Sequence, residues 1–223
     1  MIYILNIETA TKNCSVSLGK NGQLIDVIEY AGEGYSHAEK LHLFIDEILK
    51  KNKLNTTSLN AVAVSMGPGS YTGLRIGVSA AKGLAYALDL PLIAIPTLEI
   101  LARAITEQNA FVIPIIDARR MEVYSAVFNQ HEKIRATKAE ILNETSFSEY
   151  LNQKKTIFIG DAVDKTGNIV QHENAIYSDI RFPSAKEMSA LSWNRYEKGE
   201  FEDVAYFEPF YLKDFISTKK KSI

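Results

Sequence analysis

A glycine-rich segment, Ser65–Gly83, constrains the fold of this chain most strongly. Glycines stand at positions 67, 69, 73, 77 and 83, which are five of the chain's 12 glycines. Glycine is used where a Cβ atom would clash or where φ must be positive. Apolar residues at 62–66, the turn formers Pro68 and Gly69, and an apolar helical pattern from Ser70 onward predict a strand, a tight turn and a helix. The segment therefore predicts a unit of an α/β domain whose backbone is approached closely.

The start of this helix allows two interpretations. Free N–H groups at a helix N-terminus can hold an anion, so a phosphate site is one of them. The segment lacks the Gly-x-x-x-x-Gly-Lys-Ser/Thr spacing of a P-loop and matches the Gly-x-Gly-x-x-Gly fingerprint poorly. Spacing alone therefore favours the simpler interpretation, a tight crossover within the domain.

Two predicted helices carry more apolar or small side chains than one sheet face requires. After residue 70, small residues recur at steps of four and three, and the helix expected at 36–51 has an apolar stripe with Phe44 at its edge. Such faces are either buried twice within the domain or shared with a partner. We expect a partner surface made of His37, Leu41, Phe44, Ile45, Ile48, Gly73, Arg75, Gly77, Ala80 and Leu84. Gly77→Trp or Ile45→Asp is then expected to block association and leave the monomer folded.

The composition is that of an ordinary globular protein. The chain has 223 residues, 46% of them hydrophobic, and its net charge of −2 predicts no general attraction to nucleic acid or anionic membranes. The single Cys14 excludes an internal disulfide and a cysteine zinc cluster. With no leader-like segment and no apolar run of about 20 residues, a cytoplasmic protein without membrane contact is expected. The basic run Lys219–Lys221 is expected to be a solvated tail.

Two openings of the same kind, about a hundred residues apart, predict a duplicated α/β unit. In each, an apolar strand ends in an acid and is followed by a second strand. The expected elements are strands at 2–7, 14–18, 24–30, 61–66, 92–95, 111–117, 122–128 and 156–159, and helices at 36–51, 71–88, 97–107 and 184–198. We therefore expect two domains, residues 1–105 and 106–223, with the extreme C-terminus packing back on the first.

The acids that end the two opening strands are Glu8 and Asp117. In duplicated folds of this type such acids reach the cleft between the domains, where the phosphates and metal of a nucleotide would sit. Thr9, Thr11 and Ser15 would then lie near the phosphates. The alternative is that both acids are strand-end residues satisfied by neighbouring backbone N–H groups, and the sequence favours neither interpretation.

Catalytic motifs are missing from the chain. There is no His-Glu-x-x-His or Gly-x-Ser-x-Gly motif, and Cys14 has no evident base beside it in the sequence. The spacing of five between His37 and His42 places them about 140° apart on a helix, so they do not share a metal easily. No catalytic residue and no metal ligand is therefore assigned.

Several segments together resemble the TsaB (YeaZ) family. They are Ser65–Gly77, Ala81–Ala85, Ile7–Ala10, Cys14–Ser17, Ser36–Leu41, Ile95–Leu98, Asp117–Arg120, Val123–Tyr124 and Tyr211–Asp214. The resemblance covers nearly the whole chain and is weakest from 130 to 205. It implies a duplicated two-domain fold of the actin/Hsp70/sugar-kinase (RNase H-like) kind. Many relatives have Asp where this chain has Glu8, which weakens any nucleotide role of that position.

The resemblance also implies a function. It is that of a non-catalytic subunit in bacterial threonylcarbamoylation of the adenosine beside the anticodon of tRNA. The partners implied are the TsaD paralogue, bound through the first two helices, and the TsaE ATPase. ATP or ADP would lie near the subunit junction, and tRNA would be reached only through the complex. TsaD proteins carry a metal on a His-x-x-x-His motif, whereas the matching Pro96–Leu101 has no histidine.

Two other functions stay open at this level. One is an enzyme of the same fold acting alone, such as an ATP-dependent carbamoyl or phosphoryl transferase that uses Glu8 and Asp117, or a peptidase. The other is a homodimer with an unrelated regulatory role. The missing histidines and the missing nucleophile argue against the enzyme.

Overall fold

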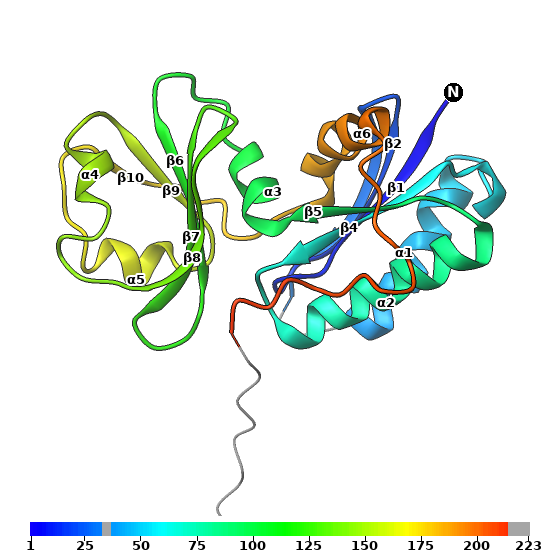
Figure 1. The fold of residues 1–223 in the computed structure, drawn as a ribbon, viewed down its shortest axis with the longest axis horizontal. Helices are drawn as coiled ribbons and strands as arrows, with labels where there is room; N and C mark the ends of the chain where they lie inside the picture. Colours follow the sequence, from blue (N-terminus) through cyan, green and yellow to red (C-terminus); the bar gives the residue numbers. More distant parts are fainter. Residues whose placement is uncertain (33–36, 214–223) are drawn as a thin grey trace, which may run out of the picture.

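The computed structural model describes residues 1–32 and 37–213, in which two five-stranded sheets lie side by side (Figure 1). The predicted helix start at Ser36 and the tail with Lys219–Lys221 lie outside the described residues. The first sheet has the order β3-β2-β1-β4-β5. Its strands are β1 (Tyr3–Glu8), β2 (Cys14–Lys20), β3 (Gln23–Tyr30), β4 (Ala61–Gly67) and β5 (Leu92–Pro96). Strands β1 to β3 form an antiparallel meander, and β4 and β5 run parallel to β1.

Helices cover both faces of the first sheet, which is why its central strands β1, β2 and β4 are buried along almost their whole length rather than at alternate residues. On one face, α1 (His37–Lys51) and α2 (Tyr71–Leu88) pack beside each other on a core that includes Leu5 and Ile7. On the other face, α6 (Met188–Lys198) packs over Ile4 and Ile93. Short 3-10 turns at Thr56–Ser58 and Ala185–Glu187 precede β4 and α6.

The second sheet repeats the first. Its order is β10-β9-β6-β7-β8, so β6, β7 and β8 correspond to β1, β2 and β3, and β9 and β10 to β4 and β5. The remaining elements are β6 (Phe111–Asp117), β7 (Glu122–Asn129), β8 (Glu132–Ile141), α4 (Ser148–Leu151), β9 (Thr156–Ile159), α5 (Val163–Gly167) and β10 (Ala175–Tyr177). The equivalent order and strand directions confirm the duplicated α/β fold that the two openings predict.

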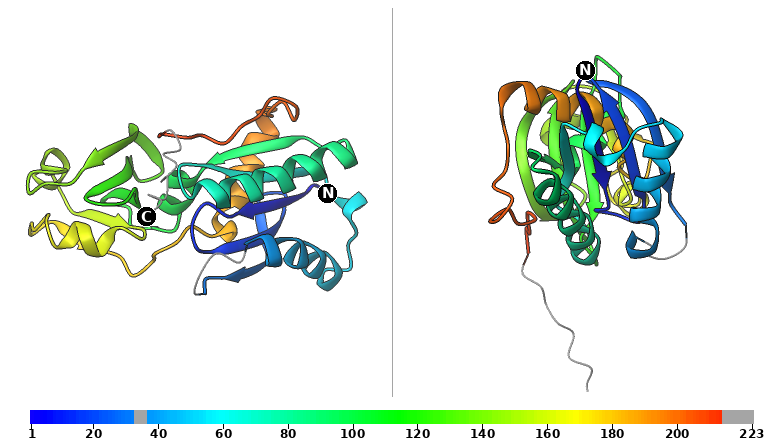
Figure 2. Two further views of the ribbon diagram at one scale, coloured as in Figure 1. Left: turned by 90° about the horizontal axis from the view of Figure 1, so that it is seen from below. Right: turned by 90° about the vertical axis from the view of Figure 1, so that its right-hand side faces the viewer.

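Helix α3 (Thr97–Arg103) joins the two sheets, since it contacts β4 and β5 of the first and β6 and β7 of the second. The division into domains at residue 105 stays a prediction. After residue 184 the chain returns to the first sheet, where it forms α6. The final segment, residues 200–213, then runs along α2 toward the second sheet (Figures 1 and 2), and we call it the C-terminal strap.

Contacts along its whole length hold the C-terminal strap in place, beginning with a bond from the Glu202 N–H to the Leu92 carbonyl oxygen of β5 at 2.8 Å. The Lys82 ammonium on α2 donates to the carbonyl oxygens of Ala205 and Phe207, at 3.2 and 2.8 Å. The Phe210 N–H donates to the Met66 carbonyl oxygen at the end of β4, at 2.7 Å. Lys213 forms an ion pair with Glu122 at the start of β7. The strap therefore connects the two halves of the molecule. Within residues 1–32 and 37–213, no helix has the length and hydrophobicity needed to span a membrane.

Candidate functional site

The loop after β1 packs into the start of α2, and Glu8 stands at its base. The Glu8 side chain is fully buried, and its Oε1 accepts the Ala10 N–H at 2.5 Å. Burial raises the pKa of Glu8 from its ordinary 4.5 to about 8, although hydrogen bonds from Ala10 and Ser65 act in the opposite direction. Glu8 is therefore mostly a neutral acid near pH 7 in the isolated chain.

Thr9, Thr11 and Ser15 are also buried, and the Thr11 hydroxyl has no hydrogen-bond partner among the described residues. The Thr9 hydroxyl donates to the Gly73 carbonyl oxygen at 2.8 Å, and the Thr11 carbonyl oxygen bonds His37 Nε2 at 2.7 Å. The Ser15 hydroxyl accepts the Ala185 N–H at 3.0 Å. The structure thus places these three residues between β1, the long helices and the returning chain. Their role as nucleotide ligands stays a prediction.

The three glycines at positions 69, 73 and 77 face this same loop. A Cβ atom at Gly69 would lie 2.3 Å from the Ala10 carbonyl oxygen, and one at Gly73 would lie 2.1 Å from the Thr9 carbonyl oxygen. At Gly77 a Cβ would lie 2.2 Å from Thr9 Oγ1. The close approach predicted from the glycines therefore exists, and the approaching segment is the chain's own β1–β2 loop. The tight crossover is the interpretation that the structure supports, and Ser70 caps α2 because its side chain accepts the Gly73 N–H.

This packing corrects part of the predicted partner surface. Gly73 and Gly77 are buried against the loop, so no partner side chain reaches them in this structure. Leu41, Ile45 and Ile48 belong to the core under α1, and His37 is only 1% exposed. The expectation that Gly77→Trp or Ile45→Asp leaves the monomer folded is wrong, because both changes would act on buried positions.

The rest of the predicted surface remains accessible. Phe44, Ala80 and Leu84 are half-buried and Arg75 is exposed. On α2, Ala80 and Leu84 lie with Ile76 and the exposed Gly83 within an arc of about 100°. We call Ile76, Ala80, Gly83 and Leu84 the outer row of α2. Apart from the helix's own backbone, no atom of the described residues lies within 4 Å of the position of a Cβ at Gly83, so the row leaves room for another molecule at this position.

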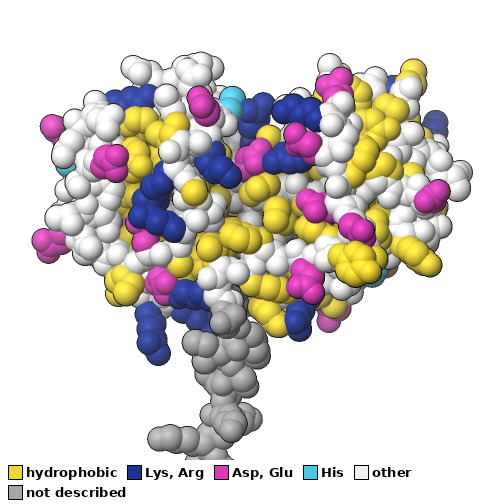
Figure 3. Space-filling model, viewed as in Figure 1, with side chains coloured by type: hydrophobic (Ala, Val, Ile, Leu, Met, Phe, Trp, Pro, Cys, Tyr) yellow, Lys and Arg dark blue, Asp and Glu magenta, His cyan; other side chains and the backbone are white. Residues whose placement is uncertain are grey.

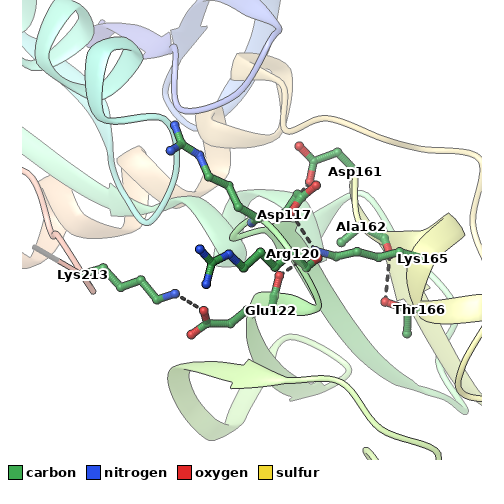
Figure 4. A network of polar contacts seen from close by, with 9 residues as sticks. Asp117, Arg120, Glu122, Asp161, Ala162, Lys165, Thr166 and Lys213 are labelled. Atoms are coloured by element: carbon green, nitrogen blue, oxygen red, sulfur yellow. Dashed lines mark hydrogen bonds and ion pairs between the residues drawn. The ribbon is translucent and has the colours of Figure 1, made fainter. Parts of the chain in front are cut away.

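In the second half, Asp117 ends β6 where Glu8 ends β1. Asp117 Oδ1 accepts the Lys165 ammonium at 2.7 Å and the Arg119 N–H at 2.6 Å, and the Asp117 N–H donates to Asp161 Oδ1 at 2.8 Å (Figure 4). The duplication predicts this equivalence of Glu8 and Asp117. Their environments differ, because Glu8 is buried and Asp117 is exposed and paired with a lysine from α5.

A cavity of about 320 Å³ lies between the two halves. Its lining comprises Asn13, Glu29, Ala31, Ile100, Leu101, Ala104, Ile180, Phe182, Pro183, Ser184, Lys186 and Glu187. None of the five predicted nucleotide residues is among them. Burial raises the pKa of Glu29, but hydrogen bonds from Ser184, Asn13 and Ser15 outweigh it and hold that pKa below its ordinary value. Sequence analysis missed this site because Glu29 and Ser184 are far apart in the chain.

The acidic, histidine and cysteine side chains that the structure describes are spread over the molecule. No group of three of these described side chains is arranged to hold a metal ion. Helix α3 matches the segment on which TsaD proteins, by the resemblance, carry their histidine motif. In this chain the core buries four residues of that helix, Thr97, Leu98, Ile100 and Leu101. The segment packs between the sheets and does not offer ligands.

Glu8→Gln is expected to change how stability depends on pH. Between pH 4.5 and about 8, the folded state retains a proton on Glu8 that the unfolded state has released. The free energy of unfolding of the wild type therefore falls as pH rises through this window, by up to about 1.4 kcal/mol per unit. The variant lacks this titration, so its free energy of unfolding should fall less steeply in urea unfolding at several pH values. Equal slopes would contradict a buried, neutral Glu8.

The fold and these sequence features are shared with proteins of known family. Residues 34–215 match the family model TsaD, tRNA N6-adenosine threonylcarbamoyltransferase. The chain is 32% identical to the tRNA threonylcarbamoyladenosine biosynthesis protein TsaB of Haemophilus influenzae, covering 98% of this chain and 97% of that protein. It is 29% identical to TsaB of Escherichia coli, covering 97% of each.

A solved structure agrees with these sequence comparisons. YeaZ from Pseudomonas aeruginosa superposes with a TM-score of 0.82 at 27% identity, covering 95% of this chain and 100% of that chain. The likeness extends over both sheets and is not limited to one half. This chain therefore belongs to the TsaB family of tRNA threonylcarbamoyladenosine biosynthesis proteins, which share a domain with TsaD.

Proposed function

We propose that this chain is a non-catalytic subunit that binds a TsaD-type threonylcarbamoyl transferase and activates it. The outer row of α2 carries the proposal. Ile76, Ala80 and Leu84 pack on the core yet remain partly exposed, and Gly83 between them leaves room for a close neighbour. Because these positions share one side of the helix, a partner helix can cover them together. Half-buried apolar side chains of this kind are typical of protein interfaces.

The environments of the strand-end acids support an accessory role. The alternative, an ATP-dependent transferase acting alone, needs Glu8 and Asp117 as charged ligands of a nucleotide's metal. Glu8 is buried with a raised pKa, and Asp117 is paired with Lys165. The apolar packing of α3 also argues against a TsaD-like metal site in this chain. ATP turnover by the isolated chain that is lost in Asp117→Ala would favour the enzyme instead.

The association is tested by sedimentation velocity of this chain with a TsaD-type protein, alone and mixed. A mixed species with one copy of each is the expected result. TsaE is expected to join this pair and not the isolated chain, and the dependence of its binding on ATP or ADP would test for a nucleotide at the junction. A stable homodimer that does not exchange with the TsaD-type protein would contradict the proposal and favour an independent regulatory protein.

A further inference from the structure

The turn between β6 and β7 presents two arginines in an unusual backbone conformation. Arg119 and Arg120 are both exposed, and their φ angles are 71° and 51°. Residues other than glycine adopt this left-handed region at a cost, and hairpin turns with two such residues in succession usually have Asn, Asp or Gly there. Strained turns persist where the surrounding structure determines them, and they concentrate at functional sites.

Lys165 from α5 holds this turn in place. Its ammonium donates to the carbonyl oxygens of Arg120 and Glu122, at 3.2 and 2.6 Å, as well as to Asp117 (Figure 4). The Arg119 N–H donates to the Asp117 carboxylate, and the Glu122 N–H donates to the Arg119 carbonyl oxygen at 3.1 Å. The backbone of the turn is thus fixed at several points, and the two arginine side chains project from a rigid base.

The guanidinium groups of Arg119 and Arg120 make no hydrogen bond or ion pair with any residue that the structure describes. The nearby acids are otherwise engaged, since Asp117 pairs with Lys165 and Glu122 with Lys213. Burial raises the pKa of Asp161, the third acid at this turn. Among the residues that the structure describes, no acid therefore forms an ion pair with either of the two arginines.

Three of the other arginines, by contrast, form ion pairs with described acids. Arg135, Arg181 and Arg195 pair with Glu140, Asp164 and Glu99. The space-filling view shows Lys and Arg side chains gathered on the second half next to the end of the described chain (Figure 3). The chain as a whole carries a net charge of −2, so this cationic turn is a local feature.

We propose that the Arg119–Arg120 turn binds phosphate groups of the tRNA backbone when this chain acts in its complex with a TsaD-type protein. The inference rests on the proposed function and assigns this chain a direct contact with the substrate. Guanidinium groups match phosphate geometry and bind it in bidentate fashion. Both arginines are exposed and neither lines the cavity of about 320 Å³, so that cavity provides no enclosure for a ligand at this turn. A polyanion needs none, because its affinity is the sum of many exposed contacts.

The test compares two double variants in complex with the TsaD-type protein. Arg119→Gln/Arg120→Gln removes the two charges from the turn. Lys133→Gln/Lys155→Gln removes two exposed charges from the opposite end of the second sheet, where Lys155 precedes β9 and Lys133 is the second residue of β8. The dissociation constant for an unmodified tRNA transcript is measured over a range of salt concentrations.

The arginine variant is expected to bind tRNA roughly tenfold more weakly at physiological salt, with the slope of log K against log salt reduced by about 1.5. The lysine variant should match the wild type. The variant Arg119→Lys/Arg120→Lys should retain most of the salt dependence, because it keeps both positive charges. This variant therefore distinguishes an effect of the lost charges from an effect of an altered turn. Unchanged affinity and slope in the arginine variant would overturn the inference, and so would a loss of ATP binding without a loss of tRNA binding.

Assembly is measured on the same samples, which separates this inference from the proposed function. A wild type that does not bind the TsaD-type protein contradicts the proposed function. The tRNA titrations are then made with the chain alone, and the comparison between the arginine and lysine variants still decides the inference. Circular dichroism and thermal unfolding of each variant show that the fold is retained.

Discussion

Replacing Gly73 with alanine is expected to lower the free energy of unfolding by about 3 kcal/mol or more. The new Cβ would lie 2.1 Å from the Thr9 carbonyl oxygen, which is backbone and does not move aside cheaply. Relief of the clash requires α2 to shift from the β1–β2 loop, and this shift also breaks the hydrogen bond from the Thr9 hydroxyl to the Gly73 carbonyl oxygen. Urea unfolding followed by circular dichroism measures the change.

Gly83→Ala is the matched control on the same helix. Nothing lies within 4 Å of its Cβ position, so the change adds a helix-favouring residue without a clash. It is expected to stabilise the protein by about 0.5–1 kcal/mol. If alanine is tolerated equally at positions 73 and 83, α2 does not pack on the β1–β2 loop as described. Gly73 and Gly77 would then again be candidates for the partner surface.

Ala80→Glu is expected to weaken association with the TsaD-type protein by about 100-fold, which corresponds to about 2.7 kcal/mol. Ala80 lies in the outer row of α2 between Ile76 and Leu84, and a buried carboxylate there would have no partner of opposite charge. The monomer should remain folded because Ala80 is half-buried and glutamate favours helix. Isothermal titration calorimetry gives the dissociation constant.

Ser79→Glu provides the control for this change. Ser79 is exposed and adjacent in sequence, but it points about 100° away around the helix. The Ser79→Glu variant introduces the same charge outside the outer row of α2, so its affinity for the TsaD-type protein should stay within about threefold of the wild type. Equal losses in both variants would indicate a general charge effect, and no loss in Ala80→Glu would place the interface elsewhere.

The sequence predicted the duplication and the secondary structure around it, because each half repeats an apolar strand, an acid and a hairpin. It also predicted the close approach at the glycines. It did not identify which segment approaches, since a face of small residues looks the same whether the chain's own loop or another molecule covers it. Leu41, Ile45 and Ile48 were assigned to a partner for the same reason, although they form the core.

Contacts between distant segments were the least predictable part of the site. The Ser184 hydroxyl donates to Glu29 at 2.5 Å across 155 residues, and no local pattern indicates this pair. Lys165 lies in a polar stretch of the sequence, yet it fixes the turn that carries Arg119 and Arg120. The sequence predicted that Glu8 and Asp117 each lie at the end of a strand. Only the packing of the folded chain shows that Glu8 is buried and that Asp117 is paired with Lys165.

The central claim, activation of a TsaD-type transferase, is tested most directly by reconstituting the modification. Threonylcarbamoyladenosine formation on tRNA is measured with TsaD, TsaE and the threonylcarbamoyl-adenylate synthase, with and without this chain. We expect formation to depend on the chain, to be lost with Ala80→Glu and to be retained with Ser79→Glu. Modification at the same rate without the chain would contradict the account.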